Sequence, residues 1–505
     1  MSLKHFSPED LRNIPLAKKK KKILLINPKR ANVLFTMPHN GLATLSAIIK
    51  KRGHEVLVVD YAFLFEDQDK DISFFIERFN PDVIGVSIYT TNAPEADKII
   101  SRINEISPKI PLMVGGPHAS LYTDVLERNN KIDYIFRGEA ELNILNIIEN
   151  ARKEKHPRVI QSNQLVDLNL LPIPDYKSFY KWELMTNYPI MTSRGCPFQC
   201  SFCASANLAY RKWRARNLDE CIEELKKAQE EISPNLKFVV FDDNPITDKQ
   251  RFKDFLVSYS TKIKAELTVV NVRADGVDDE FLKLLKKCGV KFISIGVEHA
   301  NPEVFKLINK GESLEQIEKA CKLIKKHKIS LGMSFVIGLP KDTLERTKES
   351  IKFAKKFKAD ECSINLICPY RNTPARKWFE ENNATLYNEI GYDVAPLASL
   401  RCEPPVVETK DFTRKEREKA YYMFFFGVAD ERFKLSKLPE IFSIAREYNL
   451  YSEFFFWFPR GILNQLKKGK KFIIRAISIY KNYGFNYLIK RYILFRKQNK
   501  ALKNE

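Results

Sequence analysis

Short apolar runs alternate with amphipathic stretches through the first third of the chain. Segments with helical periodicity, such as Leu42–Lys51 and Ala93–Ile106, separate the apolar runs. Strands that alternate with helices at this spacing indicate a parallel, doubly wound sheet, with ligands bound outside the carboxyl ends of its strands. The predicted strands are Ile23–Asn27, Glu55–Asp60, Val83–Ser87, Leu112–Gly115 and Tyr134–Arg137.

A second alternation of the same kind follows in the middle of the chain. Its helical patterns include Asp219–Glu231, Leu314–His327 and Leu344–Phe357. A complete barrel of this kind has eight strand–helix units, so six units predict a partial barrel that is open on one side. The predicted strands are Pro189–Thr192, Phe238–Phe241, Leu267–Val270, Phe292–Val297, Ser330–Ile337 and Ser363–Ile367.

These patterns predict an α/β protein with a third, helical part. A Rossmann-like or flavodoxin-like doubly wound domain is expected over residues 20–151 and a partial (β/α)6 barrel over residues 189–374. Residues 152–188 contain Leu171-Pro172-Ile173-Pro174 and are interpreted as a linker, because proline punctuates regular structure. Residues 375–505 are expected to be mostly helical, basic and aromatic.

Composition and charge limit the classes of protein to which this chain can belong. The 505 residues are 44% hydrophobic, enough for several buried cores, and the formal net charge is +21. No run of about 18 apolar residues, the length of a spanning helix, occurs, and the first residues do not resemble a signal peptide. A cytoplasmic protein is therefore expected, with its nine cysteines reduced.

The strongest charge asymmetry lies at the C-terminal end. Residues 460–503 contain no Asp or Glu, and bulky apolar side chains alternate there with Lys and Arg. This pattern suits peripheral contact with a membrane interface. Two other interpretations remain: an amphipathic helical cap with a solvated basic face, or stacking on RNA, which the aliphatic bulk makes the weakest of the three.

Three cysteines give the sharpest chemical signal. Cys196, Cys200 and Cys203 follow a predicted strand and lie within eight residues. Three thiolates on a four-iron cluster leave one iron open to an outside ligand. A zinc site would need a fourth ligand, and the nearest histidine, His156, lies forty residues upstream. The spacing therefore favours a [4Fe–4S] cluster over zinc.

The Cys-x3-Cys-x2-Cys pattern, with Phe202 before the last cysteine, resembles the signature of the radical SAM enzymes. That resemblance implies that the open iron chelates S-adenosylmethionine and that the cluster reduces it to a 5′-deoxyadenosyl radical. It also implies that residues at later strand ends contact S-adenosylmethionine. One departure is Tyr370-Arg371-Asn372-Thr373-Pro374, where relatives have a Pro-Gly-Thr-Pro-like turn. The candidate contacts are Asp242, Asp243, Asn244, Arg273, Glu298, Gly338, Pro340 and Pro369.

The first domain resembles the cobalamin-binding domain that precedes the barrel in one subclass of this family. The segments that carry the resemblance are Gly41–Leu45, Gly53–Val56, Gly115–Ala119 and Arg137–Glu141. The Asp-x-His-x-x-Gly motif is missing, so the resemblance implies a cobalt without a protein histidine ligand; a scaffold that binds nothing is the alternative. His39 and His118 are interpreted as loop residues or as residues that support a ligand contact, rather than as metal ligands. The candidate cobalamin contacts are Ser87, Thr90, Thr91, Gly115, Gly116 and Gly138.

The combined resemblance implies cobalamin-dependent methyl transfer to an unactivated carbon of a small molecule, with a hydrophobic lipid or tetrapyrrole preferred. Cyclisation, oxidation or carbon–carbon bond formation without net methylation are alternatives, as is RNA modification. The chain has no cysteine before Cys196 for the second cluster of RNA-modifying relatives, so nucleic acid is disfavoured. A flavodoxin or ferredoxin is expected as electron donor. The other six cysteines are interpreted as core residues, with Cys362 and Cys368 as weaker candidates for the active cavity.

Overall fold

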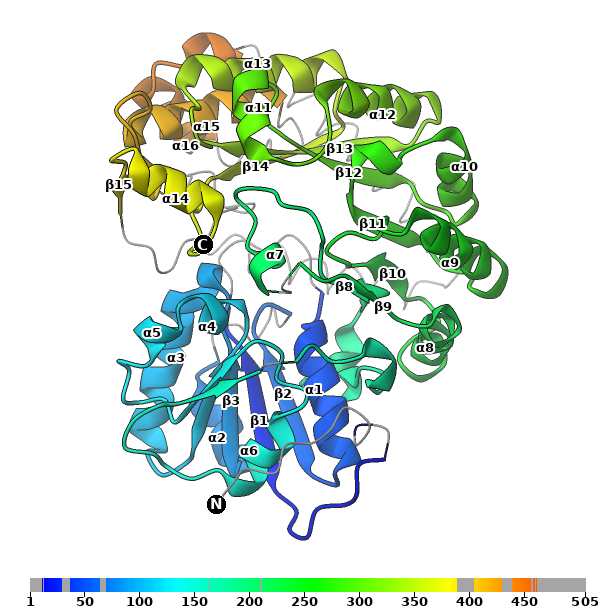
Figure 1. Ribbon diagram of the computed structural model, residues 1–505, viewed down its shortest axis with the longest axis vertical. Coiled ribbons are helices and arrows are strands. Elements are labelled where there is room, and N and C mark those ends of the chain that lie inside the picture. Colours follow the sequence, from blue (N-terminus) through cyan, green and yellow to red (C-terminus); the bar gives the residue numbers. More distant parts are fainter. Residues whose placement is uncertain are drawn as a thin grey trace.

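The computed structural model describes residues 11–460, apart from 12, 30–36, 64–69, 163, 209–210, 388–403, 429–437, 456 and 459. Two parallel six-stranded sheets dominate it (Figure 1). The basic, aromatic segment 461–505 lies outside the described residues.

The first sheet has the strand order β2-β1-β3-β4-β5-β6, which is the doubly wound order with a switch point between β1 and β3. Its inner strands are continuous apolar runs because helices cover both faces. Helix α1 contacts α6, and α2 contacts α3. The strands are β1 (Lys22–Asn27), β2 (Glu55–Asp60), β3 (Val83–Ser87), β4 (Leu112–Gly115), β5 (Tyr134–Arg137) and β6 (Arg158–Gln161), and the helices are α1 (Asn40–Lys51), α2 (Ile72–Phe79), α3 (Ala93–Ile106), α4 (Pro117–Leu121), α5 (Thr123–Leu126) and α6 (Ile144–Asn150).

The predicted linker begins inside this sheet. Strand β6 pairs in parallel with β5 along its whole length, from Tyr134 opposite Arg158 to Arg137 opposite Gln161. The edge strand is short and only half-buried, so its sequence carries no long apolar run. Residues 152–161 therefore extend the first domain, and the segment that leads to the barrel starts after them.

The second sheet forms the predicted partial barrel. Its order, β14-β13-β12-β11-β10-β7, is parallel throughout, and β7 and β14 do not pair, so the barrel stays open. The fold class expected from the sequence is confirmed. The sheet strands are β7 (Asn187–Ile190), β10 (Lys237–Val240), β11 (Leu267–Val272), β12 (Phe292–Glu298), β13 (Ser330–Ile337) and β14 (Glu361–Leu366), and the helices are α8 (Leu218–Glu231), α9 (Lys249–Lys262), α10 (Asp279–Lys287), α11 (Pro302–Ile308), α12 (Leu314–Lys326), α13 (Leu344–Lys356) and α14 (Pro374–Glu381).

The segment with the three cysteines lies between the two sheets (Figure 1). A two-stranded pair, β8 (Ser193–Arg194) and β9 (Arg214–Ala215), frames it, and the short helix α7 (Ser205–Leu208) follows the last cysteine. Arg194 and Arg214 stand opposite each other across this pair. The pair therefore holds both ends of the cysteine segment at one place.

After the barrel the described chain is mainly helical. Helix α15 (Arg414–Val428) packs on α13 and β14, and a two-stranded pair, β15 (Thr385–Leu386) with β16 (Val407–Glu408), precedes it. Phe424 of α15 lies 4.8 Å from Phe335 of the barrel, between ring centres. The next helix, α16 (Leu438–Glu447), leads to Trp457, which is fully buried against Phe425 and Phe426. Much of the aromatic content predicted for this part is thus core.

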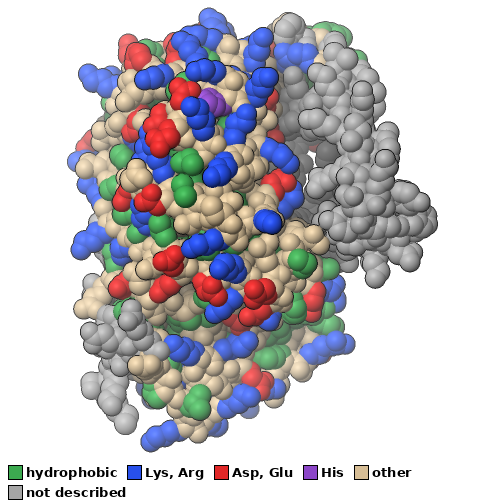
Figure 2. Space-filling model, turned by 90° about the vertical axis from the view of Figure 1, so that its right-hand side faces the viewer, with side chains coloured by type: hydrophobic (Ala, Val, Ile, Leu, Met, Phe, Trp, Pro, Cys, Tyr) green, Lys and Arg blue, Asp and Glu red, His purple; other side chains and the backbone are tan. Residues whose placement is uncertain are grey.

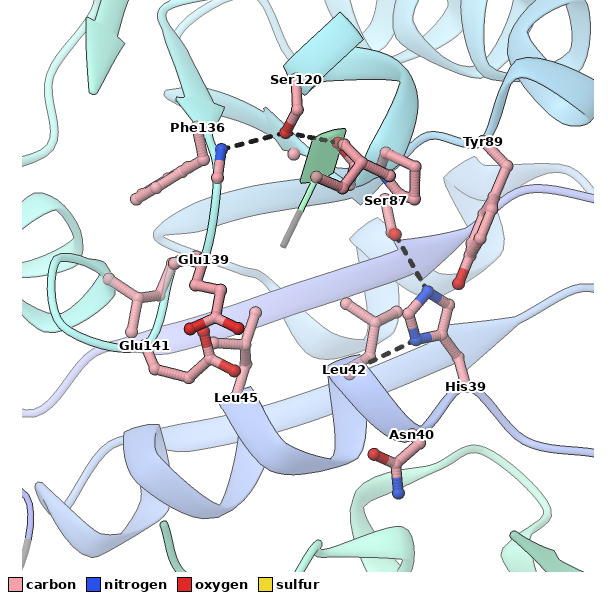
Figure 3. Close-up of a pocket in the computed structure, with 18 of the residues that line it drawn as sticks. His39, Asn40, Leu42, Leu45, Ser87, Tyr89, Ser120, Phe136, Glu139 and Glu141 are labelled. Atoms are coloured by element: carbon pink, nitrogen blue, oxygen red, sulfur yellow. Dashed lines mark hydrogen bonds between the residues drawn. The ribbon is translucent and has the colours of Figure 1, made fainter. Parts of the chain in front are cut away.

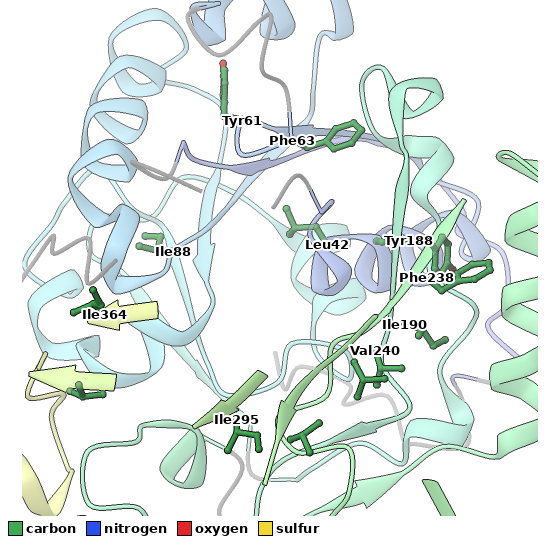
Figure 4. Packing of buried hydrophobic residues seen from close by; sticks show 14 of the residues in the cluster. Leu42, Tyr61, Phe63, Ile88, Tyr188, Ile190, Phe238, Val240, Ile295 and Ile364 are labelled. Atoms are coloured by element: carbon green, nitrogen blue, oxygen red, sulfur yellow. The ribbon is translucent and has the colours of Figure 1, made fainter. Parts of the chain in front are cut away.

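One apolar core runs through both domains (Figure 4). Tyr176, in the segment between the domains, lies 4.9 Å from Tyr188 of β7, whose ring lies 5.9 Å from Phe238 of β10. Burial of such rings stabilises the contact between domains as well as each domain. Cys221, Cys288, Cys321, Cys362 and Cys368 are buried, as expected of core cysteines, whereas Cys402 lies outside the described residues.

Surface charge does not form a single basic stripe on the face shown in Figure 2, where acidic side chains lie among Lys and Arg. Many of these charges pair across helices, such as Lys356 with Glu318 at 2.7 Å. In the part of the chain that the structure describes, no helix is both long and apolar enough to cross a membrane.

Candidate functional site

A cavity of about 350 Å³ opens where the carboxyl ends of β1, β3, β4 and β5 face the cysteine segment. This is the switch point of the first sheet, where doubly wound folds bind ligands. Its wall is mainly apolar, with Leu42 and Leu45 from α1 on one side and Phe136 of β5 on another (Figure 3). The barrel contributes Met191, Arg194, Gly195, Ser205, Leu208, Arg214 and Asp243.

Glycines let the backbone form the part of the wall at β4 and β5. Gly116 has φ +98°, and a Cβ there would lie 2.8 Å from the carbonyl oxygen of Ile88. Gly138 also has a positive φ, at +92°. With the predicted Gly115 and Ser87, these residues line the cavity, and the missing side chains leave room for a flat, bulky ligand.

Ser120 of α4 ties the two glycine loops together. Its hydroxyl donates to the carbonyl of Gly116 at 3.2 Å and accepts from the N–H of Gly138 at 2.9 Å (Figure 3). The wall is thus fixed by the protein's own hydrogen bonds. Ser120 was not among the predicted residues, since its role depends on two loops that come together only in the fold.

His39 caps α1 at the cavity edge. Its Nδ1 accepts from the N–H of Leu42 at 3.1 Å, so Nε2 carries the proton and lies 3.0 Å from Ser87 Oγ (Figure 3). Both ring nitrogens are therefore engaged in holding α1 against β3. His39 also lines the cavity, so its place beside the ligand rather than on a metal stays a prediction.

The two threonines predicted beside Ser87 do not line the cavity. Thr90 is buried, and its hydroxyl lies 3.2 Å from His118 Nδ1. Burial lowers the pKa of His118 to about 4, and its ring stacks on Tyr122 with centres 4.7 Å apart. Thr90 and His118 therefore form a packed support behind the β4 loop, and of the three predicted hydroxyls only Ser87 faces the cavity.

The cysteine segment is held from several sides by the barrel. The N–H of Ser201 donates to Ile308 at 2.7 Å, and the carbonyl of Ser201 accepts from Ala375 at 2.9 Å. Arg273 lies over the ring of Phe198, 3.5 Å from its centre. Packing and hydrogen bonds therefore set the shape of the loop between the first and last cysteine.

The donor set fits an iron–sulfur cluster. Burial raises the pKa of Cys200 to about 12 and also raises those of Cys196 and Cys203, so deprotonation must accompany metal binding. In the part of the chain that the structure describes, no three His, Cys, Asp or Glu side chains are arranged around one ion position, and this includes the three cysteines. A cubane spreads its ligands over separate irons, and the sequence expectation of three cysteine ligands stays a prediction.

The acidic residues after β10 hold the start of the cysteine segment. Asp242 is fully buried and accepts from the N–H and hydroxyl of Thr192, both at 2.7 Å, and from the hydroxyl of Ser193 at 2.6 Å. Asp243 accepts from the N–H of Gly195 at 2.8 Å and lines the cavity. Asn244 keeps a buried Nδ2 without a partner, a donor that suits a ligand group.

The charged residues at the next strand ends form one buried group. Arg273 donates to Asp275 at 2.8 Å and to the carbonyl of Lys310 at 2.8 Å. Glu298 has φ +63° and lies 3.5 Å from Lys310 Nζ, and burial raises the pKa of Glu298. A bulky residue with positive φ is strained, and strain of this kind gathers at functional sites.

The predicted turns after β13 and β14 are enclosed by the C-terminal part. Gly338 has φ +85°, and its carbonyl accepts from Arg417 of α15 at 2.8 Å. A Cβ at Gly338 would overlap that guanidinium, so α15 packs directly on the turn. Pro340 lies in the same turn, and Pro369 lines a small cavity with Tyr122 and Cys368, separate from the main one.

Two family models match this chain, and together they identify a radical SAM enzyme with a B12-binding domain ahead of the barrel. Residues 190–354 match the model of the radical SAM superfamily, and residues 27–148 match the B12 binding domain. The first match implies a [4Fe–4S] cluster and S-adenosylmethionine, and the second a cobalamin.

Several known proteins are similar to this chain in sequence or in fold over most of its length. An uncharacterised methyltransferase of Pyrococcus horikoshii is 29% identical, over 80% of this chain and 92% of that protein. The anaerobic magnesium-protoporphyrin IX monomethyl ester cyclase of Rubrivivax gelatinosus is 26% identical, over 82% and 80%. The radical S-adenosylmethionine methyltransferase TsrM of Kitasatospora setae, solved with cobalamin and a [4Fe–4S] cluster, shares the fold with TM-score 0.58 and 17% identity, over 81% and 82%.

Proposed function

We propose that this enzyme transfers a methyl group to an unactivated carbon of a hydrophobic small molecule, with cobalamin as the methyl carrier. One observation carries the proposal. A single cavity is lined by the glycine loops of the B12-binding domain and by Arg194, Gly195 and Asp243, which adjoin the first cysteine. Both cofactor regions therefore face the same cavity.

The barrel's residues prepare the site for the cluster and S-adenosylmethionine. When bound, the cluster supplies the electron that splits S-adenosylmethionine, and cobalamin supplies the methyl group. Asp242 and Asp243 hold residues 192–195 by hydrogen bonds, and Arg273 packs on the ring of Phe198. These contacts position Cys196 and Cys200 before the cluster binds. Asn244, Glu298 and the Gly338 turn are proposed to contact S-adenosylmethionine, which their positions at successive strand ends support.

The apolar wall supports a hydrophobic substrate. Apolar side chains cover much of the cavity wall, which suits an apolar ligand better than a charged one. They include Leu42, Leu45, Met113, Phe136 and Met191. The relatives named above include one that acts on a tetrapyrrole ester, so a tetrapyrrole or lipid is the proposed substrate class.

A second candidate is radical cyclisation without net methylation. The Rubrivivax gelatinosus relative is named a cyclase, and it matches 82% of this chain. The two candidates differ in the fate of the methyl group. S-Adenosylmethionine with a labelled methyl group gives a labelled product only in the methyl-transfer reaction.

Two partners complete the proposal. A flavodoxin or ferredoxin would reduce the cluster, and the basic, aromatic residues 460–503 would lie on an anionic membrane surface. Sedimentation with vesicles of anionic and of neutral lipid checks the second point. Binding that depends on anionic lipid and is lost without residues 461–505 is the expected result.

The test of the proposed function is a cofactor count. The protein is purified without oxygen, reconstituted with iron, sulfide and hydroxocobalamin, and compared with a Cys196→Ala/Cys200→Ala/Cys203→Ala variant. We expect about four irons per chain together with a corrinoid, and loss of the iron alone in the variant. Iron without corrinoid would contradict cobalamin-dependent methyl transfer and leave other radical chemistry standing.

A further inference from the structure

Four charged side chains cross the boundary between the two domains at the cavity wall. Glu139 and Glu141 follow β5 of the B12-binding domain, and Arg194 and Arg214 belong to the strand pair β8–β9 that frames the cysteine segment. Arg194 donates to Glu141 at 2.5 Å, and Arg214 donates to both oxygens of Glu139, at 2.5 and 3.0 Å. These two contacts, Arg194 with Glu141 and Arg214 with Glu139, are the interdomain ion pairs.

The interdomain ion pairs are enclosed. The side chains of Arg194 and Glu141 are 16% and 7% exposed. Burial disfavours the charge on Glu139, and the hydrogen bond from Arg214 with the charges of Arg194 and Arg214 outweighs it, so the pKa of Glu139 lies below its ordinary value. Glu141 and Glu139 likewise raise the pKa of Arg194 against the effect of burial. Glu139 and Arg194 are therefore charged at neutral pH.

A second ion pair between the domains has a different character. Arg371, after β14, lies 2.6 Å from Asp124 of α5, with side chains 31% and 55% exposed. It does not line the cavity, and exposed pairs of this kind contribute little to stability. It offers a matched comparison, because it joins the same two domains through the same type of contact.

Glu139 and Arg194, one residue from each ion pair, lie within two residues of a cofactor region. Glu139 follows Gly138, whose N–H is fixed by Ser120 in the glycine wall. Arg194 precedes Gly195, fixed by Asp243, and then Cys196. A change in the position of Arg194 therefore moves the first cysteine, and a change in Glu141 moves the wall where cobalamin is proposed to lie.

We propose that the interdomain ion pairs make the binding of cobalamin and of the iron–sulfur cluster cooperative, with Arg194 and Glu141 as positioning residues. The barrel already shapes the cysteine segment, and a cluster bound to its three thiolates would restrain it further, together with Arg194. The ion pair between Arg194 and Glu141 would pass that restraint to the loop after β5. Coupling of this kind is reciprocal, so each cofactor tightens the binding of the other. This inference rests on the proposed function, because it requires that the cavity binds a corrinoid.

The test measures the dissociation constant of hydroxocobalamin by absorbance titration, on full-length protein with and without the reconstituted cluster. For the wild type we expect about tenfold tighter binding with the cluster present, in the usual range of coupling between sites. Glu141→Gln should bring the two constants closer together, because it removes the nearer of the two carboxylates that hold Arg194 and leaves Glu139 at 3.7 Å. Asp124→Asn should keep the wild-type ratio.

Two further measurements separate positioning from folding. Arg194→Lys keeps the charge and loses the forked geometry, so it should retain part of the ratio and should melt close to the wild-type temperature. A wild-type ratio of one, or an undiminished ratio in Glu141→Gln with a native melting temperature, would overturn the cooperative coupling and leave the proposed function intact. A wild type that binds no corrinoid under either condition would overturn the proposed function and this inference together.

Discussion

The two parallel sheets of this enzyme use their strand ends in different ways. In the first sheet the ends of β3, β4 and β5 carry Ser87, Gly116 and Gly138, and the small residues leave a cavity open in front of them. In the barrel the end of β10 carries Asp242. Its carboxylate already accepts hydrogen bonds from Thr192 and Ser193. One sheet keeps space for a ligand, whereas the other uses charged groups to hold a loop.

The comparison shows that a polar residue at a strand end can have either of two roles: it can contact a ligand, or it can support a neighbouring loop. The position of a strand end locates the ligand face of a parallel sheet in both domains. Whether a given side chain contacts the ligand depends on what else it bonds. Asp242 supports the cysteine segment from behind, and Thr90 does the same for the β4 loop through His118.

The largest expected effect comes from removing Asp242. Asp242→Ala leaves a buried N–H and two hydroxyls of Thr192 and Ser193 without an acceptor, so we expect a loss of about 4 kcal/mol in the free energy of unfolding. Urea denaturation measures it, with the exposed Asp254→Ala as control. Normal stability combined with lost binding of S-adenosylmethionine would show that Asp242 is a ligand residue after all.

A side chain at Gly116 should damage the glycine wall. Gly116→Ala introduces strain at positive φ and a contact with the Ile88 carbonyl, and we expect a loss of about 3 kcal/mol with weakened corrinoid binding. Gly289→Ala has positive φ and no neighbour within 4 Å, so it should cost only about 1 kcal/mol. Equal losses in the two variants would contradict the role of the Ile88 contact.

His118 should make stability depend on pH. Its pKa is lowered to about 4, so it stays neutral in the fold while the unfolded chain binds a proton below about 6.5. The contribution of His118 to the free energy of unfolding is fully present above pH 6.5. It falls as the pH drops from 6.5 toward 4, by about 2 kcal/mol at pH 5. Urea denaturation of His118→Gln between pH 7.5 and 5 should give a free energy of unfolding that lacks this dependence on pH. An unchanged slope would show that His118 is not held neutral.

The smallest effect compares two predicted hydroxyls. Ser87 lines the cavity and Thr91 does not. Ser87→Ala should weaken hydroxocobalamin binding about fivefold, the effect of one hydrogen bond, and Thr91→Ala should leave it unchanged. A larger effect from Thr91→Ala would reverse the assignment of the two residues.

The inner strands of both sheets could be predicted because burial on two faces leaves continuous apolar runs. Val83–Ser87 and Ser330–Ile337 have the same bounds in the structure. Strand β6 could not, because an edge strand that is short and half-buried has no such run. The cysteine spacing and the glycines at β4 are local features, and both pointed to the cavity region.

Other parts of the site depend on contacts between distant residues. Arg194 reaches Glu141 across 53 positions, and Asp242 reaches Thr192 across 50. Nothing in the local sequence distinguishes these charged residues from helix caps or solvated groups. The Arg137–Glu141 segment resembles a known family in its sequence, but only the fold shows that its two glutamates face arginines of the other domain.

The central claim is that both cofactors occupy one cavity, and electron paramagnetic resonance tests it most directly. Spectra are recorded for protein that holds cob(II)alamin alone, the reduced cluster alone, and both together. The account predicts that the spectrum of the doubly loaded protein shows broadening or splitting from interaction between the two spins. A spectrum equal to the sum of the two single-cofactor spectra would place the cofactors apart and contradict the shared cavity.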